Sequence, residues 1–178
     1  MNYRIFLLII GFSILVWGCD EAFYDHSGPP PPGDDEIGLV VAPAYQGGYF
    51  VAGQKYYVDG ASDIADLFLA FFDEDGHAQW TMAYSTDLHN EPLAARQTND
   101  RGFLILVQRS LPGEWHTAYN YYVLKVDEGG HVQWRQDISP GIIDDVVDAD
   151  ATDDGGFILL GHGGPDHAVT LLKTDILR

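Results

Sequence analysis

A long internal repeat constrains the fold of this chain more than any other feature of its sequence. The segments GGYFVAG, RGFLILV and GGFILLG begin at Gly47, Arg101 and Gly155, which are equally spaced along the chain. FFDEDGHAQW, from Phe71, and KVDEGGHVQW, from Lys125, are separated by the same interval. Self-similarity at a fixed period predicts an array of similar structural units that pack on one another.

The repeat divides the chain into three units. We expect one domain at 37–178, with units at about 38–91, 92–145 and 146–178. The third unit is shorter and ends soon after LLKTDILR begins. We interpret the recurring residues as turn and core residues of the fold; they are Gly48, Gly102, Gly156, Asp73, Asp127, Asp175, Trp80 and Trp134.

Each complete unit is predicted to contain four β-strands. In the second unit these are PLAARQT, GFLILVQ, YYVLKVD and HVQWRQDI, with the turn sequences NDRG and DEGG at two of the joints. Glycine supplies positive φ in such turns, and Asp or Asn caps its own turn. The run 103–107 is apolar on both faces, which is typical of a strand covered on both sides. We therefore expect an all-β protein with few or no helices and eleven strands, because the third unit stops before its fourth strand.

The pattern D-G-G-F-x-x-x-G, followed by K-x-D-x-x-G-x-x-x-W, resembles the repeat of bacterial envelope lipoproteins that contain multi-bladed β-propeller domains. The second unit carries it as DRGFLILV and KVDEGGHVQW. The resemblance covers about 38–178 and implies that each unit is a four-stranded blade. Propellers usually have four to eight blades. We therefore expect an open, incomplete set of blades, completed by a homodimer or by another blade donor. The alternatives are a β-trefoil and a truncated propeller remnant without independent function.

The start of the chain predicts a lipid anchor. Residues 5–17 are almost wholly apolar and follow the charged Arg4. At about 1.5 Å per residue, such a run is too short for the roughly 30 Å hydrocarbon core, and is typical of a signal peptide, here 1–18. The sequence Val-Trp-Gly-Cys that ends at Cys19 resembles the bacterial lipobox. The resemblance implies a diacylglycerol on Cys19 and a location in the cell envelope, at the outer membrane or cell surface.

Residues 19–36 predict a disordered, proline-rich spacer between this lipidated cysteine and the domain. The formal net charge of −18 at pH 7 makes nucleic acid a poor partner. No Ser-His-Asp, phosphate-binding or zinc pattern is present. We therefore expect no enzyme activity and no cofactor, but a membrane-anchored binding or scaffold module. Its binding surface is expected at 56–63 and 111–119, where aromatic residues interrupt polar turns.

The acidic stretch DDVVDADATDD provides the alternative hypothesis, a Ca²⁺-binding or enzymatic site on the third unit. The candidate Ca²⁺ ligands are Asp144, Asp145, Asp148 and Asp150. The stretch lacks the spacing of an EF-hand loop. Asp150 corresponds to Arg96 one unit earlier, on strands that would line the centre of a propeller. We therefore predict an ion pair between Arg96 and Asp150.

The histidines divide into two groups. His77 and His131 occupy the same place in two units, just after a turn glycine, so we assign them to the fold. His162 and His167 lie in the shortened part of the third unit and are the remaining candidates for metal binding.

Overall fold

The computed structural model describes residues 35–56, 65–85, 88–110, 120–138, 143, 145–163 and 168–174. Within these ranges the chain forms eleven strands and no helix, so the all-β prediction is confirmed. No helix in this part of the chain has the length and hydrophobicity needed to cross a membrane. The signal peptide, Cys19, almost all of the spacer and the loop residues 57–63 and 111–119 lie outside the described residues.

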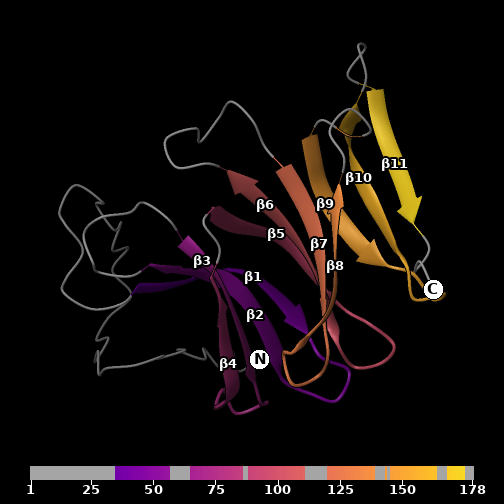
Figure 1. The fold of residues 1–178 in the computed structure, drawn as a ribbon. Coiled ribbons are helices and arrows are strands. Elements are labelled where there is room, and N and C mark those ends of the chain that lie inside the picture. The colour runs from indigo at the N-terminus through magenta and orange to yellow at the C-terminus, as the bar shows by residue number, and fades with distance from the viewer. Residues whose placement is uncertain are drawn as a thin grey trace, which may run out of the picture.

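The strands form three antiparallel sheets of four, four and three strands (Figure 1). The first contains β1 (Asp35–Pro43), β2 (Tyr49–Tyr56), β3 (Ala65–Phe72) and β4 (Ala78–Tyr84). The second contains β5 (His89–Gln97), β6 (Phe103–Ser110), β7 (Asn120–Val126) and β8 (Val132–Ile138). The third contains β9 (Asp145–Ala151), β10 (Phe157–Gly163) and β11 (Ala168–Thr174).

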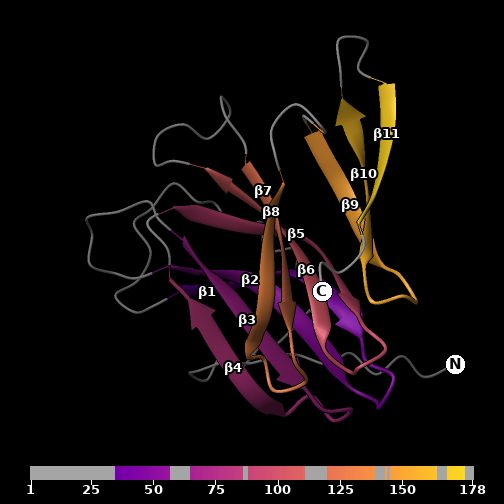
Figure 2. The same ribbon diagram turned by 45° about the vertical axis from the view of Figure 1, so that its right-hand side comes forward.

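The second sheet lies between the other two, as both ribbon views show (Figures 1 and 2). Within each sheet, every strand pairs with its neighbour in sequence, because short connections favour antiparallel pairing. The described strands remain in three separate sheets and do not close into a barrel. The β-trefoil alternative requires a closed barrel and is therefore wrong.

The core consists of two apolar layers, one on each face of the second sheet. Phe103 and Ile105 are buried against residues of the first sheet, and Phe103 stacks on Phe50 with ring centroids 4.1 Å apart. Leu104 and Leu106 point to the opposite face and are buried with residues of the third sheet. Successive side chains of a strand point to opposite faces. The unbroken apolar run of β6 therefore holds both neighbouring sheets, as the sequence predicts.

Each first strand contains one extra residue that interrupts its pairing with the second strand. These β-bulges lie at Leu39, Leu93 and Val147, again one repeat interval apart. A bulge bends its strand and increases the local twist. The repeat pattern therefore contains a bulge in the first strand of every unit, which the sequence analysis did not predict.

Two predicted boundaries differ from the structure. β1 begins at Asp35, inside the predicted spacer, because Asp35 still pairs with Tyr56. β5 begins at His89, before the predicted start of the second unit at 92, because its pairing with β6 extends to Ser110. Both first strands are longer than predicted because their partner strands continue beyond the repeated motif.

Candidate functional site

The strands are joined by two kinds of connection, at opposite ends of each sheet. At the first end, which we call the turn end, every connection is a short turn; these turns are 44–48, 73–77, 98–102, 127–131 and 152–156. At the other end, which we call the loop end, the connections follow Tyr56, Tyr84, Ser110, Ile138 and Gly163. The repeated motif glycines and aspartates that the structure describes all lie at the turn end.

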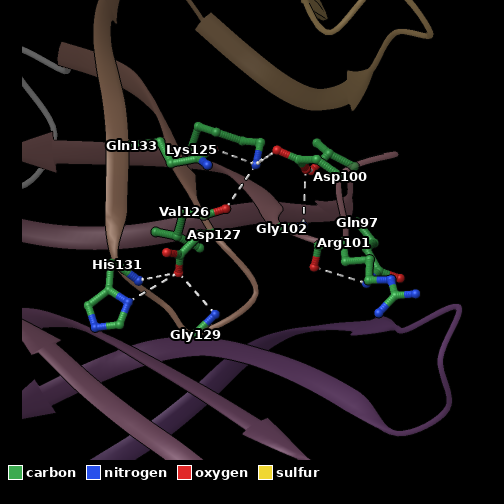
Figure 3. Close-up of polar contacts among 11 residues, drawn as sticks. Gln97, Asp100, Arg101, Gly102, Lys125, Val126, Asp127, Gly129, His131 and Gln133 are labelled. Atoms are coloured by element: carbon green, nitrogen blue, oxygen red, sulfur yellow. Dashed lines mark hydrogen bonds and ion pairs between the residues drawn. The ribbon is translucent and has the colours of Figure 1, made fainter.

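The turns between third and fourth strands are organised by an aspartate. Asp127 Oδ1 accepts hydrogen bonds from the backbone amides of Gly129 at 2.9 Å and His131 at 2.8 Å (Figure 3). Asp73 accepts the same bond from His77, at 2.9 Å. These amide bonds stabilise the carboxylate and lower the pKa of both Asp73 and Asp127. Both histidines are exposed, and the Nδ1 atom of each lies within 3.5 Å of the aspartate in its own turn. The structure therefore places His77 and His131 in the turns themselves.

In the second and third units, the turns between first and second strands are organised by an aspartate and a lysine. Lys125 Nζ is buried and donates to Asp100, to the carbonyl of Val126 and to Gln133, each at 2.9 Å (Figure 3). Burial alone would raise the pKa of Asp100, but hydrogen bonds from Thr98, Lys125 and a backbone amide together lower it.

The third sheet repeats this lysine–aspartate pair. Lys173 donates to Asp154 and holds the pKa of that carboxyl well below its usual range. Asp154 Oδ1 also accepts from the amide of Gly156, at 3.2 Å, as Asp100 accepts from Gly102. The K-x-D part of the motif is therefore explained by turn structure, although Asp175 lies outside the described residues.

Close backbone approach accounts for the repeated glycines. A Cβ on Gly102 would lie 2.2 Å from the carbonyl oxygen of Val126, and a Cβ on Gly48 would lie 2.2 Å from that of Phe72. No side chain fits at such distances. The preceding position has positive φ in all three units, and in the second unit a non-glycine residue, Arg101, occupies it with φ 67°.

The repeated tryptophans lie on the fourth strands and contact the following unit. Trp80 Nε1 donates to the carbonyl of Glu128 at 2.9 Å, and its ring packs beside Gly130, where a Cβ would lie 2.8 Å from the ring. Trp134 stacks on Phe157 with ring centroids 5.9 Å apart. Both side chains therefore join consecutive sheets, in agreement with a packing role.

The predicted pair of Arg96 and Asp150 lies within ion-pair distance, with Nε 3.7 Å from Oδ1. The closer partner is Asp148, whose two carboxylate oxygens accept from Arg96 Nη2 at 3.1 and 3.2 Å. Asp145 instead accepts from the Tyr121 hydroxyl at 3.1 Å, and Asp144 lies outside the described residues.

The described residues contain no group of three or more acidic, histidine or cysteine side chains that could hold a metal ion. Asp148 and Asp150 are instead directed at a guanidinium group. His162 is exposed on β10 and paired in register with Val169, whereas His167 lies outside the described residues.

The loop end holds a different arrangement, a buried polar cluster between the first and second sheets. It consists of Gln54 on β2, His89 and Asn90 on β5, and Tyr122 on β7, all of them buried. Gln54 Nε2 lies 2.8 Å from His89 Nε2 and donates to the carbonyl of Asn90 at 2.9 Å. Tyr122 donates to Asn90 Oδ1 at 3.0 Å. Buried polar side chains are uncommon. Their presence in the interface between two sheets makes this cluster a candidate functional site.

The hydrogen bonds of the cluster determine the tautomer of the His89 imidazole. Because Gln54 Nε2 donates to a carbonyl and its Oε1 accepts from Tyr56, the orientation of the amide is fixed. An amide nitrogen can only donate, so His89 Nε2 acts as the acceptor. His89 is therefore held as the tautomer that carries its proton on Nδ1.

The polar cluster extends to the protein surface through Tyr122. The Arg135 guanidinium lies over its ring at 4.1 Å from the centroid, and that of Arg109 lies at 5.8 Å. Both arginines also pair with Asp137, at 2.8 and 3.3 Å. Burial raises the pKa of the Tyr122 phenol to about 12, so the hydroxyl remains a hydrogen-bond donor at neutral pH.

Unlike the turn end, this cluster follows the repeat only in part: Gln54 has a counterpart in Gln108, but the histidine and the tyrosine have none. The residue one repeat interval after His89 is Ile143, which is also buried. The residue one repeat interval before Tyr122 is Phe68. The sequence analysis did not identify the cluster, although a histidine at a position that is isoleucine in the next unit was a visible signal.

The fold and the site define an all-β protein of three packed antiparallel sheets, with a polar cluster between the first two. No family model and no curated protein matches the chain. A crystal structure of a protein of unknown function from Bacteroides caccae is similar to it with a TM-score of 0.44 and 14% sequence identity. The match covers 79% of this chain and 46% of that one, so this chain spans about half the length of that protein.

Proposed function

We propose that this protein is a bacterial envelope lipoprotein, anchored through Cys19, whose three sheets form an open propeller-like arc. We assign it a non-catalytic binding or scaffold role, with the binding surface at the loop end. Two features support a propeller-like arrangement. Each sheet is formed by consecutive strands, and the first strands β1, β5 and β9 contact one another in order.

The observation that carries the binding role is the contrast between repeated and unrepeated polar residues. The repeated polar residues, such as Asp127 and Lys125, are used in turns. The cluster around His89 and Asn90 is buried, spans two sheets and interrupts the repeat. A polar network that the repeated architecture does not require is best explained by recognition. At the surface, Arg109 and Arg135 lie over the buried ring of Tyr122 and offer two guanidinium groups.

Site-specific photo-crosslinking tests where a partner binds. A photoreactive amino acid is placed in the full chain at Asp137, which is exposed at the loop end, and separately at Asp153, which is exposed at the turn end. We expect crosslinked adducts in the bacterial envelope from position 137 only. Adducts of equal yield from both positions, or from position 153 alone, would contradict a binding surface at the loop end.

Metabolic labelling with an alkyne fatty acid tests the anchor separately. We expect the label on the full chain, membrane fractionation of the labelled protein, and loss of both in Cys19→Ser. Because the chain contains a single cysteine, no other thiol can carry a thioether-linked lipid. A labelled Cys19→Ser chain, or an unlabelled unsubstituted chain, would overturn the anchor.

A further inference from the structure

The third sheet presents an apolar face that no described residue covers. This face, which we call the front face, is formed by β10 and β11. Val169 is 72% exposed, Leu171 is 66% exposed and Leu160 is 38% exposed. Leu160 and Leu171 are paired in register, so they form one continuous apolar patch. Monomeric proteins seldom expose several large apolar side chains side by side, and such patches mark interaction sites.

The repeat shows which surface of the second sheet corresponds to the front face of the third. Leu160 and Leu171 are paired as Leu106 and Val123 are paired in the second sheet. Both second-sheet residues are 0% exposed, because the third sheet packs on them. The front face of the third sheet is therefore the same half of the sheet-to-sheet interface that the second sheet already uses.

The first strand supplies the other half of that interface. β5 contacts β1, β2 and β3 of the preceding sheet, and β9 contacts β5 and β6. Ala95 on β5 and Ala149 on β9 are 1% and 3% exposed at these contacts. Val41 corresponds to them in the first unit, one repeat interval before Ala95, and is 64% exposed. On this face of the first sheet, Val41 on β1 and Tyr49 on β2 are exposed, whereas Phe68, Ala70 and Phe72 on β3 are buried, so the exposed part of the complementary half lies along β1.

We infer that a second copy of this chain covers both surfaces, with β1 of each copy packed on β10 and β11 of the other. Each chain carries one example of each half with exposed apolar side chains, along β1 and on β10 and β11, so two copies bring all four surfaces together. Such a head-to-tail contact forms a ring when its rotation closes. Two copies supply six sheets, which is within the four to eight blades of closed propellers. The contact reproduces the interface that already joins the three sheets.

This inference does not depend on the lipid anchor, and the two can fail separately. Bis-maleimide crosslinking reads the proposed contact directly. Val41 and Leu160 correspond by repeat to Ala95 and Ala52, which share one buried cluster between neighbouring sheets, and to Ala149 and Leu106, which share the next. Full-length chains with Val41→Cys and one tag are therefore mixed by co-expression with chains with Leu160→Cys and a second tag. We expect a crosslinked dimer that carries both tags, and none from either chain expressed alone.

The controls separate this contact from adventitious crosslinks. The unsubstituted chain shows whether Cys19 itself reacts, which would count against lipidation and not against the contact. Val132→Cys, at an exposed apolar residue of the middle sheet, replaces Leu160→Cys as the matched control and should give no dimer. Absence of the two-tag dimer overturns the inference. A chain with both Val41→Cys and Leu160→Cys should crosslink no further than the dimer, and a ladder of larger species overturns the two-copy ring.

The mass of the full-length protein in detergent gives an independent test. Leu171→Asp places a charge in the centre of the proposed contact, whereas Val132→Asp makes the same kind of change outside it. We expect sedimentation to give two chains per particle for the unsubstituted protein and for Val132→Asp, and one chain for Leu171→Asp. Both substituted side chains are exposed, so unchanged circular dichroism is expected for each. One chain per particle for the unsubstituted protein overturns the inference.

Discussion

The two ends of the sheets use polar side chains in opposite ways. At the turn end, Asp73 and Asp127 hold equivalent turns in two different sheets with the same backbone hydrogen bonds. At the loop end, His89 and Asn90 form bonds across a sheet-to-sheet interface that has no copy one unit later, where the chain has Ile143. The turn end is thus specified by the repeat, whereas the loop end differs from unit to unit.

The difference separates polar residues that stabilise a single turn from polar residues that join two sheets. The aspartate carboxylates of the turn motifs, such as Asp73, Asp100 and Asp127, accept hydrogen bonds from their own turn or from an adjacent strand. The loop-end cluster instead needs residues from β2, β5 and β7 together. Substitutions at the two ends should therefore have different consequences, and the following four predictions test that contrast.

The largest effect is expected at the turn end, from Gly102→Ala. The added Cβ would lie 2.2 Å from a backbone carbonyl oxygen and 2.3 Å from Lys125 Nζ, so the turn must move. We expect the free energy of unfolding to fall by about 3 kcal/mol, as for other overpacked sites, in urea titrations followed by circular dichroism. Gly38→Ala is the control, since its Cβ would meet only a flexible Val51 methyl group at 3.2 Å. Equal losses would contradict the assigned role of the repeated glycine.

At the loop end, the phenol of Tyr122 should control stability in alkali. Its pKa is about 12 in the folded protein and 10.0 otherwise, so the folded state holds the proton more tightly. Stability from this group is therefore complete below pH 10 and is lost as the pH rises towards 12. Two pKa units correspond to roughly 2 to 3 kcal/mol. Tyr122→Phe should reduce the alkaline slope, leaving the part that comes from Tyr84, whose pKa is also raised by burial, and an unchanged slope would show that the Tyr122 ring is not buried as described.

A smaller gain is expected from Arg101→Gly at the turn end. Arg101 has φ 67° at a position that is glycine in the other two units. The left-handed conformation costs a side-chain-bearing residue about 1 kcal/mol, so the glycine variant should be more stable by about that amount. Arg101→Ala retains the Cβ and serves as the control, with no gain expected. A gain of the same size for alanine would assign the effect to loss of the charge.

The smallest net change is expected from replacing part of the polar cluster with apolar residues. In Gln54→Leu combined with His89→Ile, both members of one hydrogen-bonded pair are removed together. Removing both members of a hydrogen-bonded pair is nearly neutral, but the Asn90 carbonyl also loses its bond from Gln54, so we expect a cost of about 1 kcal/mol, whereas His89→Ala alone should cost about 2 kcal/mol. A loss of several kcal/mol in the double variant would show that the cluster exists for folding and would end the contrast between the two ends.

The sequence was sufficient for most of the architecture because its signals are local and occur more than once. The turn residues around Asp127 and the apolar run of β6 each act within one unit, and copies at a fixed interval support the interpretation. The bulges at Leu39, Leu93 and Val147 were not predicted, because an extra residue in a strand leaves the hydrophobic pattern almost unchanged. They are evident only in the pairing between strands.

The candidate site was harder to predict because it depends on contacts between sheets. Gln54 and His89 are 35 residues apart, and nothing in either strand indicates that they meet. For the ion pair, repeat alignment identified Arg96 and the correct neighbouring strand but not the closer of two aspartates. Asp148 and Asp150 are two residues apart and share a face, so both reach Arg96, whereas the alignment selects only the residue at the same repeat position.

The tryptophans on the fourth strands have a practical consequence. Trp80 is hydrogen-bonded to a turn of the second sheet, and Trp134 stacks on a ring of the third, so each half-buried indole contacts the sheet that follows its own. The wavelength of maximum fluorescence emission of each indole therefore reports whether the following sheet has separated or unfolded. In a chain that also carries Trp17→Phe and Trp115→Phe, Trp134→Phe leaves Trp80 to report its contact with the second sheet, and Trp80→Phe leaves Trp134 to report its contact with the third.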